Sequence, residues 1–288
     1  MKIALYTCLA LIAFAGNSVL CRLALEDAAM DAGSFTAIRL LSGLAVLLVI
    51  LKLVKPSAGV TQSKGSWKAA FFLFVYALAF SFAYLSLETG VGALILFGAV
   101  QITMILVSLA SGYRLHGLEW LGVLVAFAGF VYLVLPDLAT PTFTGFVLMA
   151  VSGIAWGFYT LAGKNSENPL ADTAYNFLRC MPLVVVLVAL TYQEAALSPR
   201  GVLLAVVSGG VTSGIGYAIW YAAMGGLSAL QAAVLQLLVP VLAAAGGVVF
   251  ASEGISLRLL LSSALVLGGI LVVILGKQYG SDRSRRCD

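Results

Sequence analysis

The chain alternates between long apolar runs and short polar segments. A helix needs about 20 apolar residues to span a bilayer, and ten runs approach or exceed that length. The period-two alternation that marks membrane β-strands is absent. The pattern therefore predicts an all-α integral membrane protein with ten transmembrane helices. The predicted ranges are Ile3–Cys21, Ser34–Val54, Ala69–Leu87, Val91–Ser111, Gly117–Leu135, Phe143–Gly163, Thr173–Tyr192, Gly201–Met224, Ser228–Ala251 and Leu257–Gly276.

The first run has a second interpretation. Met1-Lys2, the apolar stretch and Ala13-Phe14-Ala15 together also fit a cleavable signal peptide. Asn17 and Arg22 follow directly after that site, and the run has a counterpart in the second half of the chain. Both observations favour a helix that stays in the protein.

Basic residues are distributed unevenly between the two sides of the predicted bundle. If the N-terminus faces the cytoplasm, eleven lysines and arginines fall on that side, and Arg22, Arg200 and Arg258 fall outside. Cytoplasmic loops of membrane proteins carry such an excess. Both termini are therefore predicted to be cytoplasmic. The short loops and compact tail are typical of a protein of the bacterial cell inner membrane.

Composition narrows the class further. Hydrophobic residues make up 62% of the chain and charged residues 10%, against about 25% charged residues in soluble domains. The net charge of +4 comes from scattered basic residues, so no nucleic-acid partner is expected. The four cysteines show neither metal-site nor disulfide spacing. We therefore expect no metal and no cofactor.

The two halves of the chain resemble each other in the order of their helices. A shift of 140 residues places Arg39 on Arg179. We predict a first five-helix repeat over 1–139, a second over 140–276 and a basic cytoplasmic tail over 277–288. Because five is odd, the second repeat enters the membrane inverted. Inverted repeats recur in secondary transporters, which bind substrate near the midplane between the halves and work by alternating access.

Several short motifs occur near corresponding points of the two halves. They are Ala15-Gly16-Asn17 and Ala155-Trp156-Gly157, Phe35-Thr36-Ala37-Ile38-Arg39 and Tyr175-Asn176-Phe177-Leu178-Arg179, Gly112, Arg114-Leu115 and Trp120-Leu121-Gly122, and Pro240 with Glu253. On these motifs the chain resembles the drug/metabolite transporter superfamily, in particular its ten-helix EamA-type exporters. The family often has a glutamate where this chain has Tyr113, so only the second half keeps that acid, as Glu253.

The resemblance implies a function. Members of the family export amino acids, their derivatives and other small metabolites. In length, helix number and aromatic content, the chain looks most like the family's aromatic amino-acid exporters. The sequence contains no GxxxxGK[ST] motif for ATP hydrolysis, which agrees with a secondary transporter.

Aromatic side chains recur at helical spacing in three of the runs. Three- and four-residue spacing places them on one helix face, and converging faces would form an apolar cavity with hydroxyl and indole groups in its wall. An interfacial aromatic belt or plain helix packing would give the same spacing. The candidate substrate-binding aromatic residues are Phe80, Tyr84, Trp156, Tyr159, Tyr217 and Trp220.

Amide side chains inside the apolar runs form a second group of candidates. They cost free energy in hydrocarbon unless they are paired or face water. An amide can bind both the carboxylate and the ammonium group of an amino acid, whereas an interhelical hydrogen bond is the structural alternative. We predict that Asn17, Gln101 and Gln236 bind substrate.

Charged residues near the ends of the runs are candidates for coupling or gating. Arg39 and Arg179 could recruit anions, although their symmetric placement favours snorkelling or loop anchoring. Glu88, at the outer end of the third run, could exchange a proton or simply be solvated. No catalytic residues are expected, because the one histidine, His116, lies in a loop and no acid lies in the middle of a run.

The resulting hypothesis is a secondary transporter that exports small metabolites by alternating access through a central cavity between the repeats. Aromatic or apolar amino acids are the expected substrates. A uniporter or exchanger of other small metabolites or drugs is the alternative, while a carrier of sugar phosphates or nucleotide sugars would need more basic residues at the cavity. The expected partners are a small-molecule substrate and the lipid bilayer. A monomer is expected, with an oligomer left open, and an enzyme is not expected.

Overall fold

The fold is built almost entirely from helices. The computed structural model describes residues 2–26, 29–54, 65–110, 117–134, 141–163, 166, 168–224, 227 and 235–285. Its helices are α1 (Lys2–Leu25), α2 (Ala32–Leu53), α3 (Trp67–Ala83), α4 (Thr89–Ala110), α5 (Gly117–Val134), α6 (Phe143–Gly163), α7 (Pro169–Thr191), η2 (Tyr192–Glu194), α8 (Pro199–Val207), η3 (Ser208–Ile215), α9 (Gly216–Met224), α11 (Val239–Phe250) and α12 (Leu257–Arg285). The segments α8, η3 and α9 follow one another without a break and form one rod whose middle is a π-helix. The predicted all-α fold class is confirmed.

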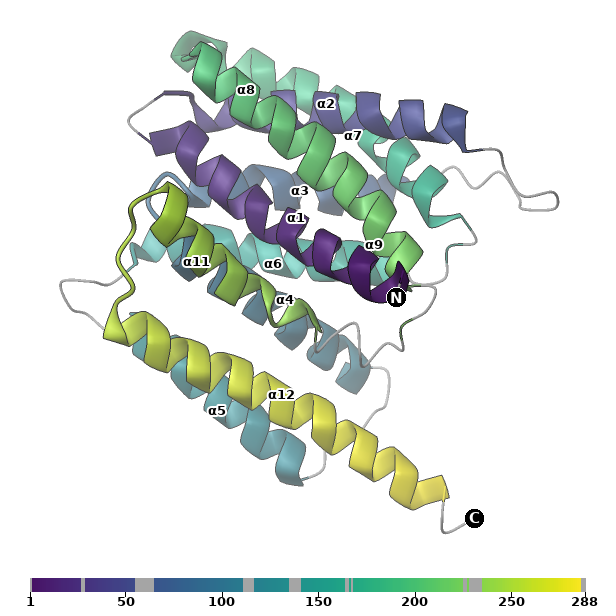
Figure 1. The fold of residues 1–288 in the computed structure, drawn as a ribbon, viewed down its shortest axis with the longest axis vertical. Coiled ribbons are helices and arrows are strands. Elements are labelled where there is room, and N and C mark those ends of the chain that lie inside the picture. The colour runs from purple at the N-terminus through teal and green to yellow at the C-terminus, as the bar shows by residue number, and fades with distance from the viewer. Residues whose placement is uncertain are drawn as a thin grey trace.

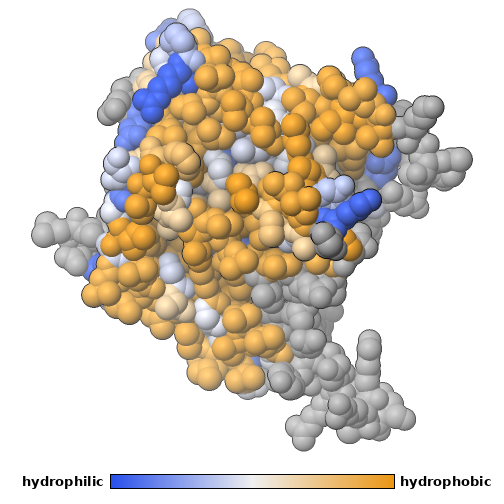
Figure 2. Space-filling model, viewed as in Figure 1, coloured by the Kyte–Doolittle hydropathy of each residue, from blue (hydrophilic) through white to orange (hydrophobic). Residues whose placement is uncertain are grey.

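Apolar side chains face outward from the bundle. Within the described residues, six helices are long and apolar enough to cross a membrane, and four shorter apolar helices accompany them. Leu190, Leu53 and Phe143 are 79%, 77% and 74% exposed, and Figure 2 shows apolar side chains over most of the visible face. Such a surface is unfavourable in water and favourable in hydrocarbon. The outward faces of these helices therefore contact lipid.

The predicted ranges each overlap a helix, and Phe143–Gly163 coincides with α6. The ninth range differs: α11 begins at Val239, and Pro240 lies in its first turn. Proline suits that place because the first N–H groups of a helix have no intrahelical acceptor. Residues 228–234 of that range lie outside the described part. Helix α12 continues to Arg285, so the segment predicted as a tail is helical up to that residue.

Polar caps fix where several helices begin. Asp31 Oδ1 accepts the N–H of Ser34 at 2.8 Å at the start of α2, and Ser66 and Ser198 cap α3 and α8 in the same way. A cap of this kind contributes about 1 kcal/mol because it satisfies a backbone N–H that the helix cannot. Asp31 Oδ2 also accepts the N–H of Ala196 at 3.0 Å. The same carboxylate thus ties the α1–α2 connection to the segment before α8.

The helices pack side by side, with α5 and α12 forming a pair at one end of the bundle (Figure 1). In the remainder, α1 packs against α8, η3, α9 and α11, α2 packs against α7 and η3, and α6 packs against α3 and α4. The N-terminal end of α1 and the C-terminal end of α12 lie on the same side (Figure 1). This agrees with a chain that crosses the membrane an even number of times.

Glycine permits the close contact between α5 and α12. A Cβ atom at Gly269 would lie 2.5 Å from the backbone nitrogen of Ala126 and 2.6 Å from the carbonyl oxygen of Gly122. A Cβ atom at Gly122 would in turn lie 2.5 Å from the carbonyl oxygen of Gly269. Backbone atoms cannot rotate out of the way as side chains do. Small residues at such positions let membrane helices approach closely and gain packing energy.

Replacing Gly269 by alanine should destabilise the protein, whereas the same change at Gly268 should not. Both residues lie in α12, but a Cβ atom at Gly268 would meet no heavy atom within 4 Å. Overpacking costs about 1–3 kcal/mol. We therefore expect purified Gly269→Ala to unfold several degrees below Gly268→Ala in a thermal melt in detergent. Equal melting temperatures would contradict the close α5–α12 contact.

Candidate functional site

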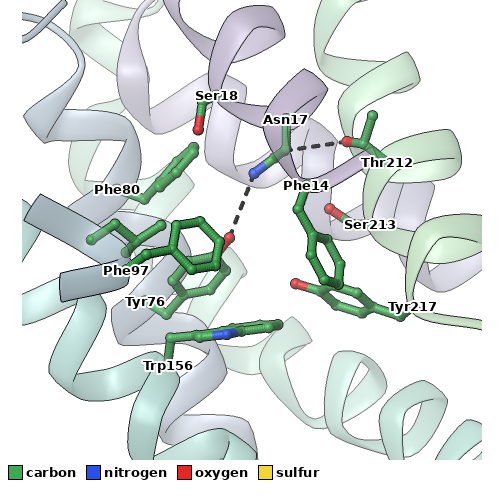
Figure 3. A pocket seen from close by; sticks show the side chains of 11 residues that line it. Phe14, Asn17, Ser18, Tyr76, Phe80, Phe97, Trp156, Thr212, Ser213 and Tyr217 are labelled. Atoms are coloured by element: carbon green, nitrogen blue, oxygen red, sulfur yellow. Dashed lines mark hydrogen bonds between the residues drawn. The ribbon is translucent and has the colours of Figure 1, made fainter. Parts of the chain in front are cut away.

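A small cavity lies where α1, α3, α4, α6, η3 and α9 meet. Its volume is about 20 Å³, enough for roughly one water molecule. Figure 3 shows aromatic rings and small polar groups facing one another across it. The lining residues are Phe14, Asn17, Ser18, Tyr76, Phe80, Leu96, Phe97, Trp156, Thr212, Ser213 and Tyr217. The wall is therefore partly aromatic and partly polar, and both halves of the chain contribute to it.

The aromatic part of the wall is a set of packed rings. The ring centroid of Trp156 lies 4.6 Å from that of Tyr76 and 5.2 Å from that of Tyr217. Phe14 packs edge-on against Tyr217 at 6.0 Å. Tilted and edge-to-face contacts at these distances are favourable. These rings occupy the aromatic side of the cavity and leave little open space between them.

Asn17 connects the polar part of the wall across three helical elements. Its Oδ1 accepts hydrogen bonds from the hydroxyl of Ser208 at 2.6 Å and from that of Thr212 at 3.3 Å. Its Nδ2 donates to the hydroxyl of Tyr76 at 3.5 Å. The backbone of Tyr76 is held as well, since Ser152 Oγ donates to its carbonyl at 3.0 Å. Asn17 thereby joins α1 to α3 and to η3.

Arg39 on α2 extends this network and is only 2% exposed. Its Nη2 donates to the hydroxyl of Tyr76 at 2.9 Å, and its Nε donates to Ser213 Oγ at 3.3 Å. The guanidinium carbon lies 4.9 Å from the ring centroid of Phe80. Nη1 has no hydrogen-bond partner among the described residues. Arg39 therefore neither snorkels nor anchors a loop, because its charge lies inside the bundle, beside the cavity.

The π-helical segment η3 lies against α2 at this point. π-Helical turns are rare and occur frequently at functional sites. Gly209 of η3 approaches the carbonyl oxygen of Arg39 and the hydroxyl of Ser42 so closely that a Cβ atom would collide with both. This approach places the hydroxyl groups of η3 next to the guanidinium on one side and the amide of Asn17 on the other.

Four of the predicted substrate-binding residues line the cavity: Asn17, Phe80, Trp156 and Tyr217. Two more lie directly behind the lining. The ring of Tyr159 contacts that of Trp156 with centroids 5.4 Å apart, and the ring of Trp220 contacts Phe14 at 5.6 Å. That these residues bind substrate stays a prediction.

Three predicted binding residues are not part of this lining. Tyr84 is fully buried, and its hydroxyl donates to the carbonyl of Thr89 at 3.3 Å. Gln101 is buried, and its Nε2 has no hydrogen-bond partner in the part of the chain that the structure describes. Gln236 is half-buried just before α11. That these three residues bind substrate also stays a prediction.

The three predicted gating residues lie in different environments. Arg39 is buried beside the cavity, whereas Arg179 is half-buried on α7 with its guanidinium carbon 5.8 Å from the ring centroid of Trp67. Glu88 is exposed in the connection between α3 and α4. A shift of 140 residues matches the two arginines in the sequence, but their surroundings in the structure differ.

The sequence-based prediction missed part of the lining. The lining residues absent from the predicted set are Phe14, Ser18, Tyr76, Leu96, Phe97, Thr212 and Ser213. Tyr76 lies four residues before Phe80, on the same aromatic face of the third run. Helical spacing was an available signal for two more of them. Phe14 lies three residues before Asn17, and Ser18 lies four residues after Phe14 on the same face of α1. Serine and threonine are common in membrane helices, so the hydroxyl groups of η3 gave no comparable signal.

A second polar cluster lies around Glu253, in the connection between α11 and α12. Its carboxylate pairs with Arg22 Nε at 3.4 Å and accepts the backbone N–H of Thr89 at 2.9 Å and its hydroxyl at 3.0 Å. Arg22 Nη1 also donates to the carbonyl of Tyr84 at 3.3 Å. A carboxylate at the first residue of α4 complements the helix dipole. The cluster ties α1, the α3–α4 connection and the α11–α12 connection together.

Glu88 lies close enough to this cluster to feel its charges. Partial burial raises the pKa of Glu88, the Glu253 carboxylate raises it further, and Arg22 opposes the rise. The neutral carboxylic acid is therefore favoured more than at an ordinary surface glutamate.

Several residues singled out in the sequence lie outside the described residues: Gly112, Tyr113, Arg114-Leu115, His116 and Cys287. Within the described ranges, no group of three or more histidine, cysteine, aspartate or glutamate side chains is placed to hold a metal ion.

Comparisons with known proteins agree with this architecture. Residues 143–275 match the EamA-like transporter family. An uncharacterized protein of Pseudomonas aeruginosa is 48% identical over 270 residues, which cover 94% of this chain and 93% of that protein. A protein named as a probable amino-acid metabolite efflux pump of Escherichia coli is 22% identical over 219 residues, covering 71% of this chain and 73% of its own.

Two further comparisons extend across most of the chain. An uncharacterized transporter of Archaeoglobus fulgidus is 27% identical over 209 residues, covering 69% of this chain and 73% of its own. A protein of known crystal structure has the same fold, with a TM-score of 0.64 and 20% identity over 96% of this chain and 99% of its own.

A lipid-facing helical bundle with a mixed aromatic and polar cavity at its centre is the architecture of a multi-pass membrane transporter. The chain belongs to the EamA-like transporter family, within the drug/metabolite transporter superfamily.

Replacing Glu88 by glutamine should stabilise the purified protein at neutral pH and change nothing at acid pH. The pKa of Glu88 is raised above its ordinary 4.5 in the folded protein. The stability that this group contributes is therefore fully present below 4.5 and is lost as the pH rises through the raised pKa. Glutamine stays neutral and avoids that loss. Thermal melts of the wild type and of Glu88→Gln from about pH 4 to about pH 8 would measure this difference in melting temperature.

The matched comparison is Glu253→Gln, which removes the charge that Arg22 and the α4 terminus bind. It should lower the melting temperature at neutral pH. If Glu88→Gln melts at the wild-type temperature at neutral pH, the carboxylate repulsion inferred at this end of the bundle is wrong.

Proposed function

We propose that this protein is a secondary transporter that exports small metabolites by alternating access, with aromatic or apolar amino acids as its substrates. The central cavity is the observation that carries the proposal. Rings of Trp156 and Tyr217 face the amide of Asn17 and the hydroxyl groups of Thr212 and Ser213 across it (Figure 3). Aromatic rings suit an apolar side chain, and a few fixed polar groups suit a polar end group.

The size of the cavity favours a closed state of such a transporter. A volume of about 20 Å³ is far smaller than an amino acid. Helices α1, α3 and α4 of residues 1–139 form one part of the wall, and α6, η3 and α9 of residues 140–276 form the other. Movement of one half against the other would therefore open the cavity, as alternating access between repeats requires.

The contacts among the helices support an inverted repeat. In the proposed repeat, α1 to α5 correspond in order to α6, α7, the α8–η3–α9 rod, α11 and α12. The α5–α12, α4–α11 and α2–α7 contacts then each join a helix to its own counterpart. The contact between α3 and α6 corresponds to the contact between α8 and α1, and both contacts are present. A pseudo-two-fold relation between residues 1–139 and 140–276 accounts for this pattern.

We further propose that the protein lies in the bacterial inner membrane with both termini in the cytoplasm and works as a monomer. The excess of lysine and arginine on the side of the termini supports this orientation. Export is supported by the name of the Escherichia coli relative, an amino-acid metabolite efflux pump.

Uptake into proteoliposomes of the purified protein tests the proposal. A panel of radiolabelled amino acids is offered without an imposed gradient, and then with a proton gradient. Saturable uptake of phenylalanine, tyrosine or tryptophan, competed by the other two, is the expected result. Acceleration by unlabelled amino acid trapped inside the vesicles would distinguish an alternating carrier from a channel. No uptake of any amino acid under either condition would overturn the proposed substrate class.

Replacing Trp156 by alanine should reduce phenylalanine uptake at least about tenfold, since an aromatic contact contributes up to about 1.5 kcal/mol beyond the area it buries. The matched control is Trp120→Ala, which removes a tryptophan that is 52% exposed on α5 and does not line the cavity. Both variants should insert into the membrane at wild-type levels. Wild-type uptake by Trp156→Ala would exclude that residue from the site.

A further inference from the structure

One charged group beside the cavity has no counter-charge within the described residues. The ion pair between Arg22 and Glu253 belongs to the separate cluster at the α11–α12 connection. No described carboxylate is paired with Arg39, which is 2% exposed. An arginine keeps its proton in proteins, so this positive charge persists inside the bundle. A buried charge is unfavourable unless a partner neutralises it.

Arg39 also has unused hydrogen-bonding capacity. A guanidinium group carries five N–H donors in a planar fork. Nε is occupied by Ser213 and Nη2 by Tyr76, whereas Nη1 has no partner in the described part of the chain. Nη2 carries a second N–H beside Nη1, and the edge formed by these two nitrogens matches the two oxygens of a carboxylate, which arginine binds with paired hydrogen bonds.

The guanidinium group is one side chain away from the cavity. Both of its hydrogen-bond partners, Tyr76 and Ser213, line the cavity, and so does Phe80, whose ring lies 4.9 Å from the guanidinium carbon. The rings of Tyr76 and Phe80 also flank the cation on its apolar side. An anion that entered between the hydroxyl groups of Tyr76 and Ser213 would meet the guanidinium directly.

We infer that Arg39, with the hydroxyl groups of Tyr76 and Ser213, is the subsite for the carboxylate of the transported molecule. The ligand class is a small monocarboxylate with an aromatic or apolar body. The inference rests on the proposed transport function and deepens it by naming the group that the site recognises. In the empty protein the two hydroxyl groups hold the cation in place, and the carboxylate supplies its missing charge.

The described wall offers no matching site for an ammonium group. Its lining contains no aspartate or glutamate. Asn17 Oδ1 already accepts hydrogen bonds from Ser208 and Thr212, which use both of its lone pairs. The charge of Arg39 repels a second cation at short range. The amino group of an amino acid is therefore not required, and deaminated acids bind at least as well as amino acids.

Three ligands of similar size test the inference on the wild-type protein. They are 3-phenylpropanoate, phenylalanine and 2-phenylethylamine, which share the ring and the two-carbon chain and differ in their charged groups. Each is titrated into the purified protein in detergent while its thermal unfolding is followed. The two carboxylates should raise the melting temperature, and 2-phenylethylamine should require at least about tenfold higher concentration for the same effect. Equal stabilisation by 2-phenylethylamine and 3-phenylpropanoate would overturn the inference.

Two matched variants locate the effect on Arg39. Arg39→Met removes the charge and should abolish the response to 3-phenylpropanoate. Arg258→Met is the control, since the guanidinium carbon of Arg258 also lies near an aromatic ring, at 5.5 Å from the centroid of Tyr132, but outside the cavity lining. It should respond as the wild type does. A response retained by Arg39→Met would overturn the inference, and if that variant does not fold, the wild-type titrations decide.

The titrations and the proteoliposome uptake assay together distinguish failure of this inference from failure of the proposed function. If phenylalanine is transported but 2-phenylethylamine stabilises the protein as well as the acids do, the proposed transport function is supported and the carboxylate subsite is wrong. If no amino acid is transported but 3-phenylpropanoate still stabilises the protein in an Arg39-dependent way, the carboxylate subsite is supported and the proposed amino-acid substrate is wrong.

Discussion

Hydrocarbon offers no hydrogen-bond partners, so every polar group buried between these helices must be satisfied by the protein itself. The network that runs from Ser208 through Asn17 and Tyr76 to Arg39 and back to Ser213 meets this requirement at the centre of the bundle except at Arg39 Nη1, which has no partner among the described residues. It links α1, α2, α3 and η3 through hydrogen bonds between side chains. Asn17, Tyr76 and Ser213 of this network line the cavity, so the network supplies polar groups of its wall.

The centre and the edge of the bundle are held together by different interactions. At the edge, α5 and α12 meet through Gly122 and Gly269 with backbone against backbone, which fixes their distance. At the centre, amide, hydroxyl and guanidinium groups hold the helices, and such groups can exchange partners. This difference suits a transporter in which a firm helix pair flanks a core whose contacts change when substrate binds.

The segments that cross the membrane were predictable because apolar length is a local property of the chain. The residues of the site were only partly predictable. Asn17, Trp156 and Tyr217 were found, since an amide or a large ring in an apolar run is conspicuous by itself. Ser213 and Phe14 were missed, because a hydroxyl or phenyl group in a membrane helix has an ordinary structural explanation. Their role depends on neighbours that the chain brings from distant segments.

The sequence by itself determined that this protein spans a membrane, where its helices lie and which broad family it resembles. Those properties depend on the composition of continuous stretches. Only the tertiary structure decided that Arg39 lies buried beside a cavity with Nη1 unpaired among the described residues, whereas Arg179, which a shift of 140 residues matches to it, lies beside Trp67 and outside the cavity lining. The two arginines have similar local sequences. Their surroundings differ because burial and pairing depend on which side chains the neighbouring helices present, and these are not repeated between the halves.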